Sequence, residues 1–274
     1  MMSNLPATSQ ELALRIRQTA LTMCYQKKAS HLGGAFSAAD MLAVLYHEVM
    51  AARPAEPRWA ERDRLYYSKG HACTALYAVL AERGYFPRAD LDTFTDDGSL
   101  LTSHVNHKVA GVELSTGSLG HALSVACGVA LAGLRQRKTW HSYVIVSDGE
   151  LDEGSNWEAI LFAPHHRLDN LTLVVDYNKI QSFGSTAEVL NLDPLADKFK
   201  AFGWDTIEVD GHNHAALAAA LAKRGRTPGR PRAVIAHTIK GKGVDFMEGQ
   251  LAWHYKSPNQ DQYQQAMAQL QVQA

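Results

Sequence analysis

Cysteine is scarce in this sequence, and charge of neither sign dominates it. The 274 residues include three cysteines, Cys24, Cys73 and Cys127, which lie far apart and form no C-x-x-C pair. This pattern argues against a disulfide framework and against a cysteine zinc site, so we expect reduced thiols in packed positions. The 27 Lys and Arg residues nearly balance the 28 Asp and Glu residues, for a formal net charge of −1. The charge therefore favours neither nucleic acid nor an anionic membrane surface as the main partner.

Long hydrophobic runs are also missing. No apolar stretch approaches the roughly 18 residues of a membrane-spanning helix, and the N-terminus, MMSNLPATSQELALRIRQ, lacks the apolar core of a signal peptide. We therefore expect no membrane association and a cytoplasmic location. Hydrophobic residues make up 46% of the chain and charged residues 20%, as in ordinary globular proteins. No linker, repeat or low-complexity stretch divides the chain, so we predict one domain over residues 1–274.

Short apolar runs alternate with helical patterns along the chain. We predict buried parallel strands at residues 143–146, 171–176, 206–209 and 233–237, and a shorter strand at 65–68. We predict helices at residues 9–29, 37–49, 70–82 and 120–134, and a surface helix or frayed tail at 260–273. Ser37 is expected to be the N-cap of the second helix. The alternation predicts an α/β fold, doubly wound, with a mainly parallel sheet and helices on both faces.

Two of these strands end in residues that can hold a cation. One apolar run leads into Asp148 and Gly149, and the next leads into Asn178, 30 residues after Asp148. A right-handed β-α-β crossover puts such strand ends side by side at the carboxyl edge of a parallel sheet. The Asp148 carboxylate, the Asn178 amide oxygen and a nearby carbonyl, for which we choose Ile180, are ligands that Mg²⁺ prefers. Gly149 would let the backbone approach a diphosphate closely.

A helix that opens near Asp152 would direct its free N–H groups at the same crevice. We interpret Glu150 and Asp152 themselves as favourable acids in a first helical turn. Other nucleotide sites fit poorly, because the Gly-Lys-Gly at residues 241–243 lacks the Ser or Thr of a P-loop and no G-x-G-x-x-G follows a strand.

Several blocks of the sequence resemble transketolase. Residues 144–184 resemble the thiamine-diphosphate motif, which opens with Gly-Asp-Gly and closes about 30 residues later with Asn, and the details EGSNWEA at 153–159 and DYNKI at 176–180 are similar to transketolase in particular. The other matching blocks are SHLGG at 30–34, DRLYYSKGHA at 63–72, GVELSTGSLG at 111–120, TIKGKG at 238–243 and WH at 253–254. The resemblance covers roughly residues 10 to 265.

This resemblance implies a cofactor, thiamine diphosphate, with Mg²⁺. The metal ligands that it implies are Asp148, Asn178 and the Ile180 carbonyl. The further cofactor contacts that it implies are His71 and Gly149 at the diphosphate and Gly117 and Leu119 at the aminopyrimidine.

The resemblance also implies the catalytic residues of a ketol transfer. Protons must leave one sugar hydroxyl and reach another oxygen while the cofactor serves as the electron sink, and imidazole titrates near working pH. The implied residues are the histidines His31, His71, His104 and His254 and two acids near a subunit interface, Glu153 and Glu158. The histidines that we interpret as surface or structural residues are His107, His165, His166, His212, His214 and His237.

A full transketolase is more than twice this length, and its second domain supplies the glutamate that activates the cofactor. The chain therefore resembles the N-terminal subunit of a split transketolase. We expect a C-terminal transketolase subunit slightly larger than this chain as partner, in an α2β2 heterotetramer, and a sugar phosphate as substrate. Two departures are Ser147 in place of the first motif glycine, and Val105-Asn106 after His104 in place of Pro-Glu.

Two alternatives remain open. The chain could be the α subunit of another thiamine-diphosphate enzyme, of the 2-oxo acid dehydrogenase or decarboxylase type, although the channel histidines and the STGSLG block argue against this. It could also be a non-catalytic paralogue, although Asp148, Asn178, His71 and Gly117 are all retained. The sequence does not identify the sugar.

Overall fold

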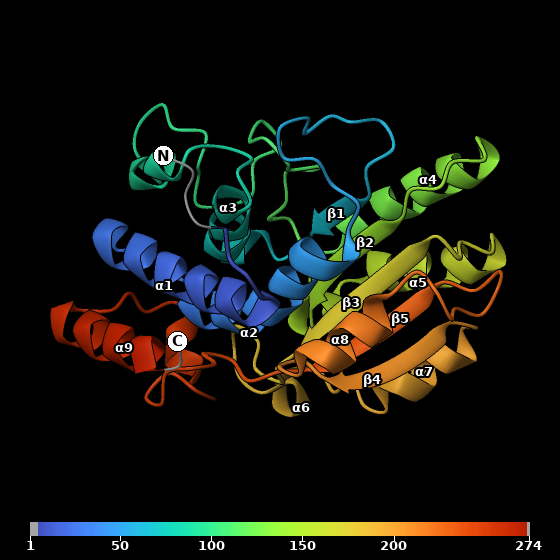
Figure 1. Ribbon diagram of the computed structural model, residues 1–274. Helices are drawn as coiled ribbons and strands as arrows, with labels where there is room; N and C mark the ends of the chain where they lie inside the picture. The colour runs from blue at the N-terminus through green and yellow to red at the C-terminus, as the bar shows by residue number, and fades with distance from the viewer. Residues whose placement is uncertain (1–4, 273–274) are drawn as a thin grey trace.

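Five parallel strands form one sheet in the computed structural model, which describes residues 5–272. Their order is β1-β2-β3-β5-β4, as the centre of Figure 1 shows. The strands are β1 (Arg64–Tyr67), β2 (Ser142–Ser147), β3 (Leu171–Tyr177), β4 (Asp205–Asp210) and β5 (Arg232–His237). This parallel sheet confirms the predicted α/β fold. Within residues 5–272, no helix is long and apolar enough to cross a membrane.

Helices lie between the strands, before β1 and after β5. The α-helices are α1 (Ser9–Lys27), α2 (Leu32–Val44), α3 (Cys73–Glu82), α4 (Ala122–Arg135), α5 (Gly154–His165), α6 (Thr186–Val189), α7 (Leu195–Ala201), α8 (His214–Leu221) and α9 (Gln260–Val272). A π-helical turn (Leu45–Val49) extends α2, and short 3-10 turns lie at Gly70–Ala72, Arg88–Thr93, Gly149–Asp152 and Leu251–His254. The predicted C-terminal helix is thus confirmed as far as the described residues reach.

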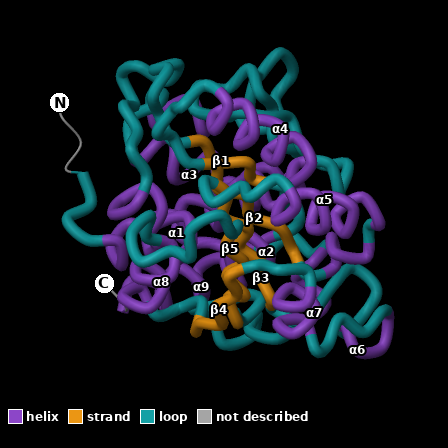
Figure 2. Tube along the Cα trace, turned by 90° about the vertical axis from the view of Figure 1, so that its right-hand side faces the viewer, coloured by secondary structure: helices purple, strands orange, loops and turns teal. Residues whose placement is uncertain are grey.

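The strands β1, β2, β3 and β5 contribute residues to two hydrophobic cores, one on each face of the sheet, whereas β4 contributes to one of them. On β2, Tyr143 and Ile145 join a core with α1, α2, α3, α8 and α9, whereas Val144 and Val146 join a second core with α4, α5 and α7. Figure 2 shows the strands running between these two sets of helices. Because both faces are covered, the central strands β2 and β3 are buried along their whole length and are mainly apolar, as the sequence predicted. The three cysteines are free and buried, which confirms that prediction too.

Two predictions about these elements are wrong. Helix α2 begins at Leu32, five residues before the predicted N-cap, and Ser37 lies fully buried inside it. The hydroxyl of Ser37 donates to Asp176 on β3 instead of capping the helix (2.6 Å). Strand β4 is at the edge of the sheet and is only half-buried, although its sequence suggested a buried strand.

A buried ion pair ties the sheet to the segments that surround its carboxyl edge. Lys69, which follows β1, pairs with Asp176 at the end of β3, and both side chains are almost fully buried. The Lys69 ammonium also donates to the Gly34 carbonyl on α2 (2.7 Å), and the hydroxyl of Thr238, which follows β5, donates to Asp176. Burial alone would raise the pKa of Asp176, but Lys69 and these hydroxyl donors hold it below its ordinary value. The pair therefore fixes the loops after β1 and β5 and the start of α2 in one place.

We predict that Lys69→Met destabilises the folded chain by about 3–5 kcal/mol, because it leaves the Asp176 carboxylate buried without its partner. Urea unfolding of the purified chain measures this change. The double variant Lys69→Met/Asp176→Asn, which removes both charges, should recover most of the loss. A loss below about 1 kcal/mol in the single variant would show that the pair is unimportant for the fold.

Candidate active site

The carboxyl ends of β2 and β3 meet at a cleft. Ser147 on β2 is in register with Asp176 on β3, so Asp148 and Asn178 leave neighbouring strands at nearly the same level. This confirms the juxtaposition that the sequence predicted. The residues that line the cleft are His31, Gly34, Lys69, His71, Gly117, Leu119, Ser147, Asp148, Gly149, Asp152, Glu153, Asn178, Ile180, Gln181, Ser182, Phe183, Lys240, His254 and Tyr255.

Asp148 is a buried carboxylate that no cationic side chain of the described residues neutralises by direct contact. It is 1% exposed and accepts hydrogen bonds from the backbone N–H groups of Gly149 (2.8 Å) and Lys179 (2.6 Å). Burial raises its pKa to about 6, and the nearby charge of Asp176 adds to the shift. A divalent cation in the cleft would offset this cost, so the residue fits a metal ligand.

Two more oxygens near Asp148 could face the same cation. The amide oxygen of Asn178 accepts only the N–H of Ile180 (3.1 Å) among described groups, which leaves a second lone pair. The Ile180 carbonyl accepts from the Lys240 ammonium (2.8 Å) and likewise keeps one lone pair. Within residues 5–272, no three His, Cys, Asp or Glu side chains gather as a metal site. A cation here would therefore need amide, carbonyl and ligand oxygens, which suits Mg²⁺.

Two positions of the cleft lining require glycine. A Cβ atom at Gly149 would lie 2.7 Å from the Gln181 Cβ atom, and one at Gly117 would lie 2.7 Å from the His104 Cδ2 atom. Gly117 also has φ of +150°, which side chains rarely adopt. At both positions the absence of a side chain lets Gln181 and His104 pack directly against the backbone of the cleft.

The four histidines that the sequence singled out come together. The ring centroid of His31 lies 5.3 Å from that of His71, 6.5 Å from that of His104 and 5.2 Å from that of His254. His31 has φ of +68°, a left-handed conformation at the start of α2, and its N–H donates to the carbonyl of His254 (2.9 Å). Such strain in a non-glycine residue is typical of functional sites. His104 is exposed and contacts this cluster from outside the cleft lining.

Three of these imidazoles are neutral at neutral pH. Burial lowers the pKa of His31 to about 4 and that of His254 to about 3, and the positive charge of Lys240 adds to both shifts. Burial, followed by the charge of Lys69, holds the pKa of His71 well below its ordinary value. The prediction that these rings titrate near working pH is therefore wrong for the free chain. They are neutral groups that can accept a proton or donate a hydrogen bond.

The acids after Asp148 lie in different surroundings. The 3-10 turn Gly149–Asp152 precedes α5, so the helix begins at Gly154, slightly later than predicted. Glu150 and Asp152 lie in the first turn of this 3-10 helix, as interpreted. Glu150 is also fully buried and accepts from the Ser68 hydroxyl and from the Gly120 N–H (2.9 Å), which the sequence did not indicate. Glu153 lines the cleft.

Glu158 lies outside the cleft. It is exposed on α5 and borders a hollow between α4 and α5 instead. In the single chain, neither Glu153 nor Glu158 is buried, so their predicted place at a subunit interface stays a prediction.

Sequence reasoning missed two cations of this site. Lys69 and Lys240 both line the cleft, and each is no more than 3% exposed. The Lys240 ammonium donates to Ile180 and to the Nδ1 atom of His254 (2.8 Å each), and burial lowers its pKa to about 8. Both lysines lie inside blocks that resemble transketolase, SKGH and TIKGKG. Their place in these blocks could have indicated that they belong to the site.

Comparison with known proteins gives matches over nearly the whole chain. The family described as "Transketolase, thiamine diphosphate binding domain" matches residues 8–273. The chain is 43% identical to the 6-deoxy-6-sulfo-D-fructose transketolase subunit of Clostridium sp. (strain MSTE9), over 93% of this chain and 94% of that protein. It is 38% identical to an apulose-4-phosphate transketolase subunit of Phocaeicola vulgatus, over 92% and 89% of the two chains.

Solved structures give the same result. The transketolase of Leishmania mexicana superimposes with a TM-score of 0.91 at 31% identity, over 97% of this chain and 41% of that chain. The chain therefore spans about two fifths of this full-length enzyme. These matches confirm the resemblance seen in the sequence. The protein belongs to the transketolase family, in which it corresponds to the thiamine diphosphate binding domain.

Proposed function

We propose that this chain is the N-terminal subunit of a split transketolase, which transfers a two-carbon ketol unit from a ketose phosphate to an aldose acceptor. The observation that carries the proposal is the buried Asp148 carboxylate at the joined ends of β2 and β3, beside a cluster of four histidines. We also propose that residues 1–274 act as a single domain.

The cleft residues suit thiamine diphosphate with Mg²⁺. Asp148, Asn178 and the Ile180 carbonyl would hold the metal ion. The ammonium groups of Lys69 and Lys240 add positive charge near the anionic diphosphate. The cofactor contacts that we propose are His71 and Gly149 at the diphosphate, Gly117 and Leu119 at the aminopyrimidine, and Asp148 and Asn178 through the metal.

Bound thiamine diphosphate would supply the electron sink for cleavage of a C–C bond beside the ketose carbonyl. The histidines would accept protons from the sugar hydroxyls and return them to other oxygens. His31 and His254, neutral and buried, can each accept a hydroxyl proton, and the Ser30 hydroxyl (2.8 Å) and the Lys240 ammonium (2.8 Å) contact their Nδ1 atoms. The low pKa of each ring means that an accepted proton is readily returned to another oxygen.

The cleft of the single chain is incomplete, which supports a partner subunit. Phe183, at the cleft, is 83% exposed, and Leu190 beyond it is 52% exposed. On α5, Leu161 is 61% exposed close to Glu158. Apolar exposure of this kind marks protein interfaces. The two relatives named above are themselves called subunits, so we propose a C-terminal transketolase subunit that supplies the activating glutamate, in an α2β2 heterotetramer.

We predict that Asp148→Ala lowers the affinity for thiamine diphosphate in the presence of Mg²⁺ by at least about 100-fold, because it removes the one carboxylate ligand. Calorimetric titration of the chain with its partner measures this. The control is Asp152→Ala, which removes another acid of the same cleft and should change the affinity by less than about threefold. Equal affinities of the Asp148 variant and the native protein would refute the metal site.

The stability of the metal-free chain should depend on the charge of Asp148. Because the pKa of this group is raised to about 6 in the folded chain, its contribution is full below about pH 4 and is lost as the pH rises through 6. Unfolding midpoints measured at pH 5 and pH 8 should therefore fall more in the native chain than in Asp148→Asn. Added Mg²⁺ and thiamine diphosphate should restore the native midpoint at pH 8. An identical pH dependence in both chains would contradict the assignment.

The reconstituted complex should act on a ketose donor that carries an anionic group. The relatives are named for a sulfonated fructose and for apulose 4-phosphate, so the assay compares these two donors with xylulose 5-phosphate and with pyruvate. We expect turnover of at least one ketose and none of pyruvate. Turnover of pyruvate alone would favour a 2-oxo acid enzyme, and failure to bind thiamine diphosphate with Mg²⁺ would favour a non-catalytic paralogue.

A further inference from the structure

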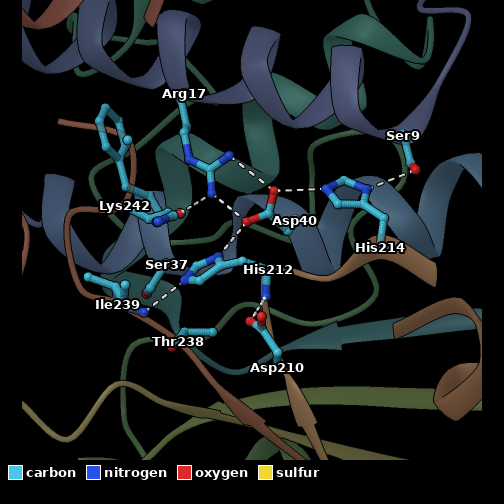
Figure 3. A network of polar contacts seen from close by, with 12 residues as sticks. Ser9, Arg17, Ser37, Asp40, Asp210, His212, His214, Thr238, Ile239 and Lys242 are labelled. Atoms are coloured by element: carbon cyan, nitrogen blue, oxygen red, sulfur yellow. Dashed lines mark hydrogen bonds and ion pairs between the residues drawn. The ribbon is translucent and has the colours of Figure 1, made fainter. Parts of the chain in front are cut away.

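A buried polar network surrounds Asp40 of α2 (Figure 3). Asp40 is 4% exposed, and its two oxygens contact Arg17 of α1, the Nδ1 atom of His212 (2.6 Å) and the Nε2 atom of His214 (3.0 Å). The charge of Arg17 and these hydrogen bonds outweigh burial and keep the pKa of Asp40 well below its ordinary value. The carboxylate is therefore a fixed acceptor at the junction of α1, α2 and the loop after β4.

His212 joins this network to the backbone that carries a cleft residue. Its Nδ1 atom faces the Asp40 carboxylate, which can only accept, so Nδ1 donates. Its Nε2 atom lies 2.8 Å from the backbone nitrogen of Ile239, which can only donate, so Nε2 accepts. Asp40 thus selects the one neutral tautomer that can hold the Ile239 N–H.

Backbone contacts hold the loop after β4 against the loop after β5. Asp210 is in register with His237, and the next N–H, that of Gly211, donates to the His237 carbonyl (2.8 Å). A Cβ atom at Gly211 would lie 2.4 Å from the Thr238 Cγ2 atom, so a larger residue there would displace the Thr238 side chain. The Asp210 carboxylate accepts the His212 N–H (2.9 Å) and orients the residue.

Ile239 stands between two residues that are anchored through their side chains. Thr238 donates to the buried Asp176, and Lys240 donates to Ile180 and His254 in the cleft. The Ile239 side chain is 38% exposed. The Ile239 carbonyl accepts the Lys242 N–H (3.2 Å), whereas among the described residues the Ile239 N–H is held by His212. The contact with His212 is therefore the hydrogen bond that fixes the N–H side of the Ile239 backbone.

We infer that His212 is a positioning residue: oriented by Asp40, it holds the Ile239 backbone so that the Lys240 ammonium stays between the Ile180 carbonyl and His254. This role replaces our interpretation of His212 as a surface or structural histidine. Its consequence for cofactor binding rests on the proposed function, whereas its effect on Ile239 and Lys240 does not.

Two substitutions of His212 separate its hydrogen bond to Asp40 from its hydrogen bond to Ile239. The amide of His212→Asn reaches the Nδ1 position and can still donate to Asp40, but it leaves Ile239 without an acceptor. The longer His212→Gln can place an oxygen near the Nε2 position and keep that acceptor. His214→Asn is the matched control, because His214 contacts the same carboxylate and Ser9 (2.8 Å) and has no bond to Ile239.

The first readout is amide hydrogen exchange of Ile239 in the full chain without ligand, followed by NMR. His212→Asn should speed exchange about tenfold, as expected for loss of one hydrogen bond. His212→Gln and His214→Asn should stay within about twofold of the native rate. Equal acceleration in His212→Asn and His214→Asn would mean that the network acts only through stability, and this result would overturn the proposal, as would no change in any variant.

The second readout is the affinity of the complex for thiamine diphosphate with Mg²⁺, measured by calorimetry. His212→Asn should weaken it about fivefold to tenfold, with recovery in His212→Gln and native affinity in His214→Asn. Native affinity in all three variants would overturn the positioning role. If the native complex itself does not bind the cofactor, the proposed function fails, and the exchange rates alone decide the role of His212. If His212→Asn does not fold, slow exchange of Ile239 in His212→Gln supports the role and fast exchange contradicts it.

Discussion

The buried pair of Lys69 and Asp176 is the interaction on which the other parts of the cleft depend. It joins segments that are remote in sequence: the turn after β1, the end of β3, α2 through Ser37 and the Gly34 carbonyl, and the loop after β5 through Thr238. A charge pair at this depth is stable only if every remaining lone pair and proton finds a partner, and here the hydroxyls and the carbonyl provide them. The same contacts therefore neutralise the pair and fix the loops that carry the site.

The two aspartates at this edge have opposite environments. Asp176 has a lysine partner and a lowered pKa, whereas Asp148, one strand away, has only backbone donors among the described residues and a raised pKa. The charge of Asp176 is neutralised within the chain and stabilises the fold. The buried charge of Asp148 destabilises the metal-free chain, so part of the binding free energy of a metal ion would come from neutralising that charge. The imidazoles of His31 and His254 beside Lys240 follow the same rule, since burial, to which the positive charge of Lys240 adds, keeps their pKa low and the rings unprotonated.

Much of this arrangement could be predicted from the sequence. The apolar, β-branched runs indicated the parallel strands, and strand order then placed Asp148 beside Asn178, because the period of a strand and the crossover rule leave few alternatives. The start of α2 was harder to predict, because Ser37 has the pattern of a cap while its hydroxyl is used by Asp176, 139 residues away. The burial of Glu150 was hidden for the same reason, since its partners Ser68 and Gly120 come from other segments. His212 gave no local signal, because its contact with Asp40 spans 172 residues.

The central claim is that Asp148, Asn178 and the Ile180 carbonyl hold the cation of a thiamine diphosphate complex. Crystals of the chain with its partner, grown with thiamine diphosphate and Mn²⁺ in place of Mg²⁺, test it most directly through the anomalous signal of manganese. We predict one strong peak within coordination distance of the Asp148 carboxylate, the Asn178 amide oxygen and the Ile180 carbonyl, in contact with the diphosphate. Diphosphate bound in the cleft with manganese absent from these three oxygens would contradict it.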